Sequence, residues 1–288
     1  MSHDFVISYK NLPLRMFELT RYSFRREQSG EVTGLKRLRA FTMPDMHTLC
    51  ADIQSAMAEF ENQFNKCMEW MGWLGLEYET AFRVLSEFFE EHRGWYVNFA
   101  KRLNKPILIE LFDERYAYFI TKFEFNFIDS MDKASALSTV QIDVENAETY
   151  DISYIGSDGK PKRPLILHAS ISGSLERDIY ALLEKEAMRI QKGEKPSFPL
   201  WLAPTQVRII PISDAQLEHC ELLLKRLKSE RIRVDLDDRD ETMQKKVRDA
   251  EKEWIPYIVV IGEREIKENK LNVRIRETGK NVSMNEEE

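Results

Sequence analysis

The chain has few cysteines and no long apolar run. Its 288 residues include only three cysteines, Cys50, Cys67 and Cys220, and no CxxC pair. A disulfide framework is therefore excluded, and a reducing compartment is expected. No apolar run reaches the roughly 18 residues of a membrane span, and the N-terminus has neither the basic region nor the apolar core of a signal peptide. We therefore expect a cytoplasmic protein with no membrane role.

The chain also has fewer basic than acidic residues, 42 against 49, which gives a net charge of −7. This balance argues against a bulk cationic surface for nucleic acid. The charge is unevenly distributed, however. Residues 21–39 contain two acidic and six basic side chains, the latter being Arg21, Arg25, Arg26, Lys36, Arg37 and Arg39. This segment predicts an anion-binding site.

The length and a hydrophobic content of 43% are sufficient for two domains. Hydrophobic periodicity predicts extended segments over residues 14–26 and 35–42, helices over 46–72, 77–103 and 173–193, and strands over 106–128 and 164–172. Beyond a boundary near residues 199–204, strands alternate with helices, which predicts βαβ crossovers and a mostly parallel sheet. We therefore expect domains at residues 1–200 and 201–288.

Two short motifs carry the chemistry. Phe24-Arg25-Arg26-Glu27, followed by a loop to Phe41, resembles motif 2 of class II aminoacyl-tRNA synthetases, and Gly173-Ser174-Leu175-Glu176-Arg177 resembles their motif 3. Either motif alone is weak, but the ordered pair ahead of an α/β domain is specific. The resemblance implies an α+β class II synthetase catalytic core, with helices on an antiparallel sheet, followed by an α/β anticodon-binding domain.

A longer resemblance narrows the family. The stretches LPLRMFE, STVQID, HASISGSLER and WLAPTQV resemble threonyl-tRNA synthetase from Leu12 to about Arg276, and EEHRGWYVNFAKRLNKPILIEL resembles the archaeal branch more than the bacterial one. This resemblance implies a threonine–tRNA ligase. Such an enzyme uses ATP to convert threonine to threonyl-adenylate and then transfers it to the 3′ adenosine of tRNA(Thr). Its partners would be ATP with Mg²⁺, L-threonine and tRNA.

The resemblance also assigns nucleotide contacts. Adenylate formation brings a carboxylate to the α-phosphate of ATP, and fixed cations must neutralise these two anions. Arg25 resembles the arginine that bridges both, and Arg177 resembles the one that grips the γ-phosphate; these two are the expected catalytic residues. The full set of expected ATP-binding residues is Arg25, Glu27, Arg37, Phe41, Thr139 and Arg177. Taken singly, each arginine could instead form a surface ion pair.

The expected threonine pocket contains Asp45, Gln141 and Tyr118. His47 and His168 match two ligands of the active-site zinc of the family, where the substrate's amino and hydroxyl groups complete the coordination. The third family ligand is a cysteine upstream of Leu12, but only eleven residues precede Leu12 and none is cysteine. We interpret Cys50 as a packed core thiol. Alternatively, the two histidines are ordinary core or surface residues.

The second domain resembles the anticodon-binding domain of the threonyl, prolyl, histidyl and glycyl enzymes. Residues 201–288 hold 17 basic and 19 acidic side chains, so recognition must be local. The resemblance assigns it to Arg248, Glu265 and Arg274, which would read unstacked anticodon bases. The alternative for each is a solvated surface charge.

A different class of function remains open. Motif 1, which builds the family's homodimer, and the cysteine ligand are not in this chain, and the last helix of the second domain is expected to be cut short. The chain could therefore be a fragment of an ordinary enzyme. In that case the removal of misattached serine would be supplied elsewhere, and formation of the homodimer would be in doubt. The chain could also be a catalytically incomplete tRNA-binding or regulatory protein. A prolyl or glycyl enzyme is disfavoured because those families do not pair histidines like His47 and His168.

Overall fold

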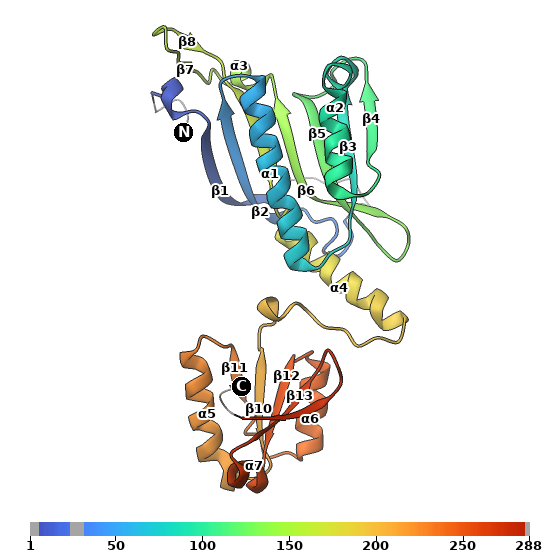
Figure 1. Cartoon of the computed structure of the whole chain (residues 1–288), viewed down its shortest axis with the longest axis vertical. Coiled ribbons are helices and arrows are strands. Elements are labelled where there is room, and N and C mark those ends of the chain that lie inside the picture. Colours follow the sequence, from blue (N-terminus) through green and yellow to red (C-terminus); the bar gives the residue numbers. More distant parts are fainter. Residues whose placement is uncertain (1–5, 24–31, 286–288) are drawn as a thin grey trace. The chain divides into compact units, whose positions relative to one another are not determined.

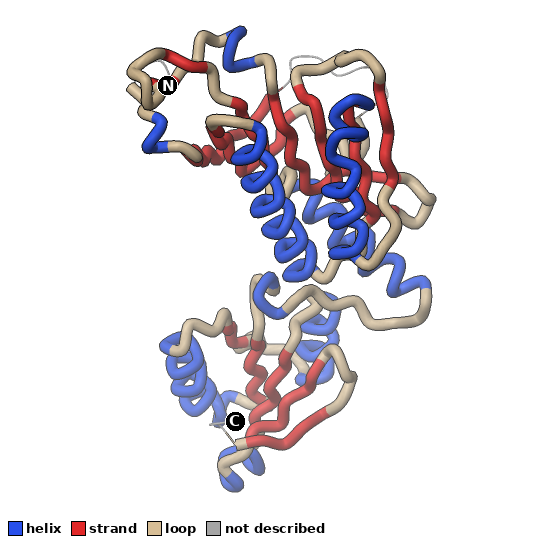
Figure 2. The backbone as a smooth tube through the Cα atoms, turned by 45° about the horizontal axis from the view of Figure 1, so that its top comes forward, coloured by secondary structure: helices blue, strands red, loops and turns tan. Residues whose placement is uncertain are grey.

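The computed structural model describes residues 6–23 and 32–285, which form two compact units, residues 1–185 and 186–288 (Figures 1 and 2). No helix in the described ranges is long and apolar enough to cross a bilayer. The motif 2 residues Arg25 and Glu27 lie outside the described residues.

A seven-stranded sheet forms the first unit, in the order β1-β2-β9-β6-β5-β3-β4. All neighbours pair antiparallel except β3 and β4, which are parallel. The strands are β1 (Leu14–Ser23), β2 (Ala40–Cys50), β3 (Glu79–Leu85), β4 (Leu108–Phe112), β5 (Phe119–Ile128), β6 (Ala134–Asp143) and β9 (Leu165–Ser170). The antiparallel sheet predicted for this domain is confirmed.

Two long helices, α1 (Ile53–Leu74) and α2 (Ser86–Leu103), cover one face of this sheet (Figure 1). Fully buried aromatic rings join the helices to the strands, and the centroids of Phe64 in α1 and Phe99 in α2 lie 4.5 Å apart. The opposite face of the sheet is open and carries the polar residues described below. Shorter elements are η2 (Tyr9–Asn11), α3 (Asn146–Thr149), β7 (Tyr154–Ile155) and β8 (Pro161–Lys162), and α4 (Leu175–Gln191) begins in this unit.

Two predicted helices were placed too early in the sequence. Residues 46–50 continue strand β2, and α1 begins only at Ile53, after the N-cap Asp52. Residues 79–85 form β3, with Thr80, Phe82 and Val84 buried on alternate positions, and α2 starts at Ser86. The residues involved fit a helical spacing, but the neighbouring strands supply hydrogen-bond partners that a local pattern does not show. The second predicted extended segment also begins later, at Ala40.

The second unit contains a five-stranded sheet in the order β11-β10-β12-β13-β14. Its strands are β10 (Val207–Pro211), β11 (Val234–Leu236), β12 (Tyr257–Ile261), β13 (Leu271–Ile275) and β14 (Asn281–Met284). The first three strands in this order are parallel and the last two antiparallel, so the expectation of a mostly parallel sheet holds only for three strands. Helices α5 (Leu217–Ser229) and α6 (Met243–Lys252) carry the separate apolar clusters of Leu223 and Ala250. The predicted α/β character of this unit is confirmed. The short helix α7 (Glu263–Glu268) and strand β14 were not predicted. The remaining elements are η3 (Leu200–Leu202) and η4 (Asp214–Gln216).

Candidate active site

Strand pairing places four polar side chains in one row across the open face of the first sheet. His47 of β2 pairs with His168 of β9, His168 also pairs with Gln141 of β6, and Gln141 pairs with Lys122 of β5. Their neighbours in sequence, such as Leu167, Val140 and Phe123, are buried. Adjacent strands lie about 4.8 Å apart. Residues separated by up to 121 positions in the sequence therefore form one continuous polar strip.

The two histidines are in contact. Their ring centroids lie 4.8 Å apart, and the ring of Tyr118 lies 5.2 Å from that of His168. Nε2 of His168 and Oδ2 of Asp143 are separated by 2.6 Å, which fixes the orientation of the imidazole. Burial and the neighbouring His168 lower the pKa of His47, and this favours its neutral form. The structure therefore brings together the two histidines that the resemblance assigned to one site.

A complete metal site is not found within the described residues, where no group of three or more His, Cys, Asp and Glu side chains could hold a metal ion. The two imidazoles are suitable as two zinc ligands. Cys50 does not supply a third. It is fully buried, and burial raises the pKa of its thiol to about 12, as expected of a packed core residue. The described residues thus fit only part of a zinc coordination shell.

Asp45 lies on the same strand as His47, two residues before it and opposite Glu18 of β1. The hydroxyl of Tyr22 is 2.8 Å from Oδ2 of Asp45 and 3.1 Å from Oε1 of Glu18. One hydroxyl proton can serve only one of these carboxylates at a time. The pair therefore keeps free acceptor capacity near the histidines, as the binding of an ammonium group requires.

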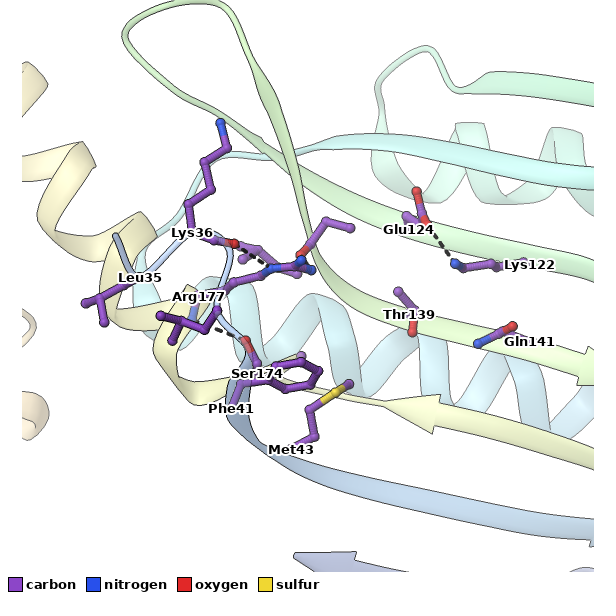
Figure 3. A pocket seen from close by; sticks show the side chains of 14 residues that line it. Leu35, Lys36, Phe41, Met43, Lys122, Glu124, Thr139, Gln141, Ser174 and Arg177 are labelled. Atoms are coloured by element: carbon purple, nitrogen blue, oxygen red, sulfur yellow. Dashed lines mark hydrogen bonds and ion pairs between the residues drawn. The ribbon is translucent and has the colours of Figure 1, made fainter. Parts of the chain in front are cut away.

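A cavity of about 270 Å³ adjoins this row (Figure 3). Strand β2 contributes Phe41 and Met43, and the loop before it contributes Lys36. Figure 3 also shows side chains from β5 and β6 and from the start of α4, namely Lys122, Glu124, Thr139, Gln141, Ser174 and Arg177. Since Gln141 belongs to both the cavity and the row, the two form one continuous site.

Gly173 allows α4 to begin against the sheet. Its φ is +74°, and a Cβ atom there would lie 2.4 Å from the main-chain oxygen of Leu137. No other residue fits this position. The hydroxyl of Ser174 then accepts a hydrogen bond from the main-chain N–H of Arg177 at 3.3 Å and caps the first turn. The motif Gly-x-x-x-Arg thus directs an arginine into the cavity at the positive end of a helix.

Arg177 is held by uncharged groups. Its Nε donates to the main-chain oxygen of Lys36 at 3.0 Å, and its Nη1 donates to that of Ala136 at 3.1 Å. No carboxylate in the described residues forms an ion pair with it. Burial and the nearby Arg37 lower the pKa of Arg177. Two guanidinium groups held close together are suited to bind a polyanion.

Glu176 binds the neighbouring strand from the same helical turn. Its Oε2 and Oε1 accept the main-chain N–H of Thr42 at 2.9 and 3.1 Å. Thr42 follows Phe41 directly, so the segments resembling motifs 2 and 3 are joined by a charged hydrogen bond. The sequence analysis had assigned no role to Glu176.

The structure brings together most of the site residues expected from sequence. Phe41, Thr139, Gln141 and Arg177 line the first cavity. Arg37 instead lines a second cavity of about 570 Å³, which shares Arg177 with the first. Tyr118 lies beside His168, near a register shift in β5 between Phe119 and Thr121. The pKa of its hydroxyl is raised, because the effect of burial outweighs that of a hydrogen bond with Gln141, which lowers it.

Lys122 and Glu124 are cavity residues that sequence reasoning missed. Nζ of Lys122 lies 2.7 Å from Oε1 of Glu124, and Nη1 of Arg83 lies 2.9 Å from the same oxygen. Although burial alone would raise the pKa of Glu124, these two cations hold it below its usual range. The available signal was the alternation of charged and aromatic residues in the segment KFEF of β5.

The three expected anticodon-binding residues differ in their surroundings. Arg248 is exposed on α6. Arg274 of β13 forms a 2.5 Å ion pair with Glu251, one turn further along α6. Glu265 instead caps α7, because its Oε2 accepts the main-chain N–H of Gly262 at 3.0 Å. Arg248 and Arg274 therefore share the α6 side of the sheet, whereas Glu265 is engaged at the far end of β12.

Two family models match the chain. The model described as tRNA synthetase class II core domain (G, H, P, S and T) matches residues 1–186, and the model described as anticodon binding domain matches residues 206–288. The boundary expected near residues 199–204 falls in the stretch that neither model covers.

Curated relatives and solved structures agree with this division. The chain is 56% identical to a threonine–tRNA ligase of Methanosarcina acetivorans over 96% of this chain and 44% of that protein. It is 55% identical to that of Pyrococcus furiosus over 100% of this chain and 47% of that protein. The chain thus spans about half the length of these relatives.

Among solved structures, the RNA binding domain of threonyl-tRNA synthetase from Cryptosporidium parvum has a TM-score of 0.80 at 23% identity, over 100% of this chain and 71% of that one. Prolyl-tRNA synthetase from the same organism, in complex with L-proline and AMP, has a TM-score of 0.74 at 16% identity, over 100% of this chain and 56% of that one. At these identities the likeness concerns the fold.

Proposed function

Because this chain belongs to the class II tRNA synthetase core family, whose model matches residues 1–186, we propose that it acts in threonine–tRNA ligation. The observation that carries the proposal is the continuous site in which the cavity around Arg177 adjoins the row containing His47 and His168. The substrates would be ATP with Mg²⁺, L-threonine and tRNA(Thr). Identity of 55–56% to threonine–tRNA ligases over nearly the whole chain supports this choice of amino acid.

In the proposed reaction, a carboxylate oxygen of threonine forms a bond to the α-phosphorus of ATP. The bond from that phosphorus to the β-phosphate oxygen breaks, and pyrophosphate leaves. Arg177 and Lys122 would compensate the negative charge, and Phe41 would lie against the adenine. Arg25 and Glu27 are proposed as further ATP contacts from outside the described residues. Mg²⁺ would enter with the phosphates and neutralise part of their charge.

The amino-acid pocket is proposed to lie along the histidine row. Asp45, with its free acceptor capacity, would bind the substrate ammonium group, and Gln141 and Tyr118 would form the adjoining wall. In the second step, a hydroxyl of the 3′ adenosine of tRNA attacks the threonyl carbonyl, and AMP leaves. The cavity around Arg177 and the row lie on one sheet face, so the same site would serve both steps.

We further propose that His47 and His168 provide two ligands to zinc. The hydrogen bond of His168 to Asp143 gives its imidazole the orientation that metal-binding histidines usually have. Zinc would supply discrimination between a substrate hydroxyl and a methyl group. A His47→Ala/His168→Ala double variant should lose zinc binding in a calorimetric titration, whereas His92→Ala should retain it. Equal zinc affinity of all three proteins would contradict the assignment.

The decisive test is threonine-dependent exchange of pyrophosphate into ATP by the purified full chain. Threonine should support exchange, and proline and glycine should not. A folded chain that binds tRNA(Thr) but supports no exchange with any amino acid would instead favour the non-catalytic binding function. Sedimentation of the same sample measures whether the chain forms the homodimer expected of the family.

The proposed anticodon contact can be tested separately. Arg248→Ala is expected to weaken binding of tRNA(Thr) about tenfold, because a base-edge or phosphate contact of arginine is lost. Lys228→Ala on α5 removes the same charge from a different helix and serves as the control. Fluorescence anisotropy with labelled tRNA measures both. An equal effect of the two substitutions would indicate a general charge effect and contradict a specific contact.

A further inference from the structure

Asp129, in the turn between β5 and β6, is a buried carboxylate with four hydrogen-bond donors. It is 3% exposed. Its Oδ2 accepts from Nζ of Lys36 at 2.7 Å and from the hydroxyl of Tyr180 at 3.0 Å. Its Oδ1 accepts the main-chain N–H groups of Met131 and Lys133 at 3.0 and 2.9 Å. These donors belong to three segments that are distant in sequence.

The same three segments also determine the position of Arg177. Lys36 supplies the main-chain oxygen that accepts from Nε of Arg177, and Ala136, just beyond the same turn as Asp129, supplies the oxygen that accepts from Nη1. Tyr180 lies on α4 three residues after Arg177, on the same side of the helix. Asp129 thus connects the helix that carries the arginine to both carbonyl groups that orient its guanidinium.

The negative charge of Asp129 is required for this arrangement. A carboxylate can accept four hydrogen bonds, whereas an amide in its place has one acceptor oxygen and two donors of its own. The hydrogen bond from Lys36 is the main reason that the pKa of Asp129 lies below its usual range, so the group stays ionised at neutral pH. The ion pair with Lys36 is largely shielded from solvent, with side-chain exposures of 22% and 2%.

We propose that Asp129 is a positioning residue for Arg177, which fixes the direction in which the guanidinium meets an anionic phosphate group. The expected effect on the KM for ATP rests on the proposed function. The dependence of the Arg177 orientation on Asp129 can be measured without catalytic activity. The effect of Asp129 on Arg177 passes through Lys36 and the β5–β6 turn.

Two measurements on the full chain test the proposal with Asp129→Asn, Lys36→Met and the double variant. The first is the ¹⁵N NMR signal of Arg177 Nε–H, assigned with Arg177→Lys, which should exchange slowly with water in the wild type and at least tenfold faster in each variant. The second is pyrophosphate exchange. The KM for ATP should rise about tenfold, the KM for threonine should stay within twofold, and the double variant should be no worse than either single one.

Asp158 offers a matched control in the turn between β7 and β8. It accepts a main-chain N–H from Lys160 at 3.2 Å and pairs with Lys162 at 3.5 Å, so Asp158→Asn removes the same kinds of contact far from the cavity. This variant should leave the Arg177 signal and the KM for ATP unchanged. If Asp129→Asn does not fold, Lys36→Met and Tyr180→Phe decide the question.

Unchanged Arg177 exchange in the folded variants would overturn the proposal. So would a loss of thermal stability with an unchanged KM for ATP, because that result indicates a purely structural role. Absence of exchange activity in the wild type would contradict the proposed function alone. The NMR comparison would still decide whether Asp129 positions Arg177.

Discussion

Arg177→Ala is expected to lower threonine-dependent pyrophosphate exchange by roughly 100- to 1,000-fold, the usual effect of removing a preorganised donor from a developing negative charge. The described residues show no ion pair that would otherwise neutralise this guanidinium, which is held by the carbonyls of Lys36 and Ala136. Its charge is therefore available to an incoming phosphate. The loss should be largest in kcat/KM for ATP, measured by steady-state exchange.

Two further variants separate charge from geometry. Arg177→Lys keeps the charge but loses the planar set of donors, so a loss of roughly ten- to 100-fold is expected. Arg163→Ala is the matched control, because Arg163 also donates to a main-chain oxygen, that of Ile152, and contacts Asp151 away from the cavity. Exchange by Arg177→Ala within fivefold of the wild type would exclude a catalytic role for this residue.

Asp178→Asn is expected to stabilise the first unit at pH 8. Asp178 is 5% exposed, its Oδ2 accepts from Nε1 of Trp70 at 3.1 Å, and its Oδ1 has no hydrogen-bond partner among the described residues. Burial raises its pKa from the ordinary 3.8 to about 7. Above that pH, the folded chain must hold a charge in a poorly solvated position. At about 1.4 kcal/mol per pKa unit, the asparagine should raise the free energy of unfolding by about 2–4 kcal/mol.

The sign of the pH dependence follows from the raised pKa. Between about pH 4 and 7, the folded state retains a proton that the unfolded state has released, so the contribution of Asp178 to stability is lost as the pH rises through 7. The difference between variant and wild type should therefore grow from pH 4 to 7 and stay constant above it. Urea unfolding of both proteins across this range measures it. Asp158→Asn, at an exposed carboxylate whose pKa is lowered, should show no such stabilisation.

Much of the candidate site was predictable because its residues occur in short motifs. The stretch from Gly173 to Arg177 was assigned by its resemblance to motif 3, and the structure shows that its glycine has a positive φ. The cationic stretch of residues 21–39 likewise indicated an anion site. His47 and His168 were paired in the sequence analysis only through the family resemblance. Nothing local to either residue indicates the other.

Other features could not be predicted from local patterns. The helices expected from residues 46 and 77 begin later, because strand pairing competes with helical spacing in those segments. Lys122 and Glu124 enter the cavity only through the pairing of β5 with β6. Asp129 has its four donors only because Lys36 and Tyr180 approach the β5–β6 turn.

The sequence by itself determined the family, the two-domain order and the types of residue available for binding an anion. The family follows from the resemblance of sequence stretches to known synthetases, whereas the domain order and the types of residue depend on composition and on local spacing. The tertiary structure decided which side chains share a site, because hydrogen-bond register between strands is set by partners far away in sequence. A shift of one residue in β2 or β9 would turn His47 or His168 to the helix-covered face. The register of the first sheet therefore converts scattered polar residues into one site.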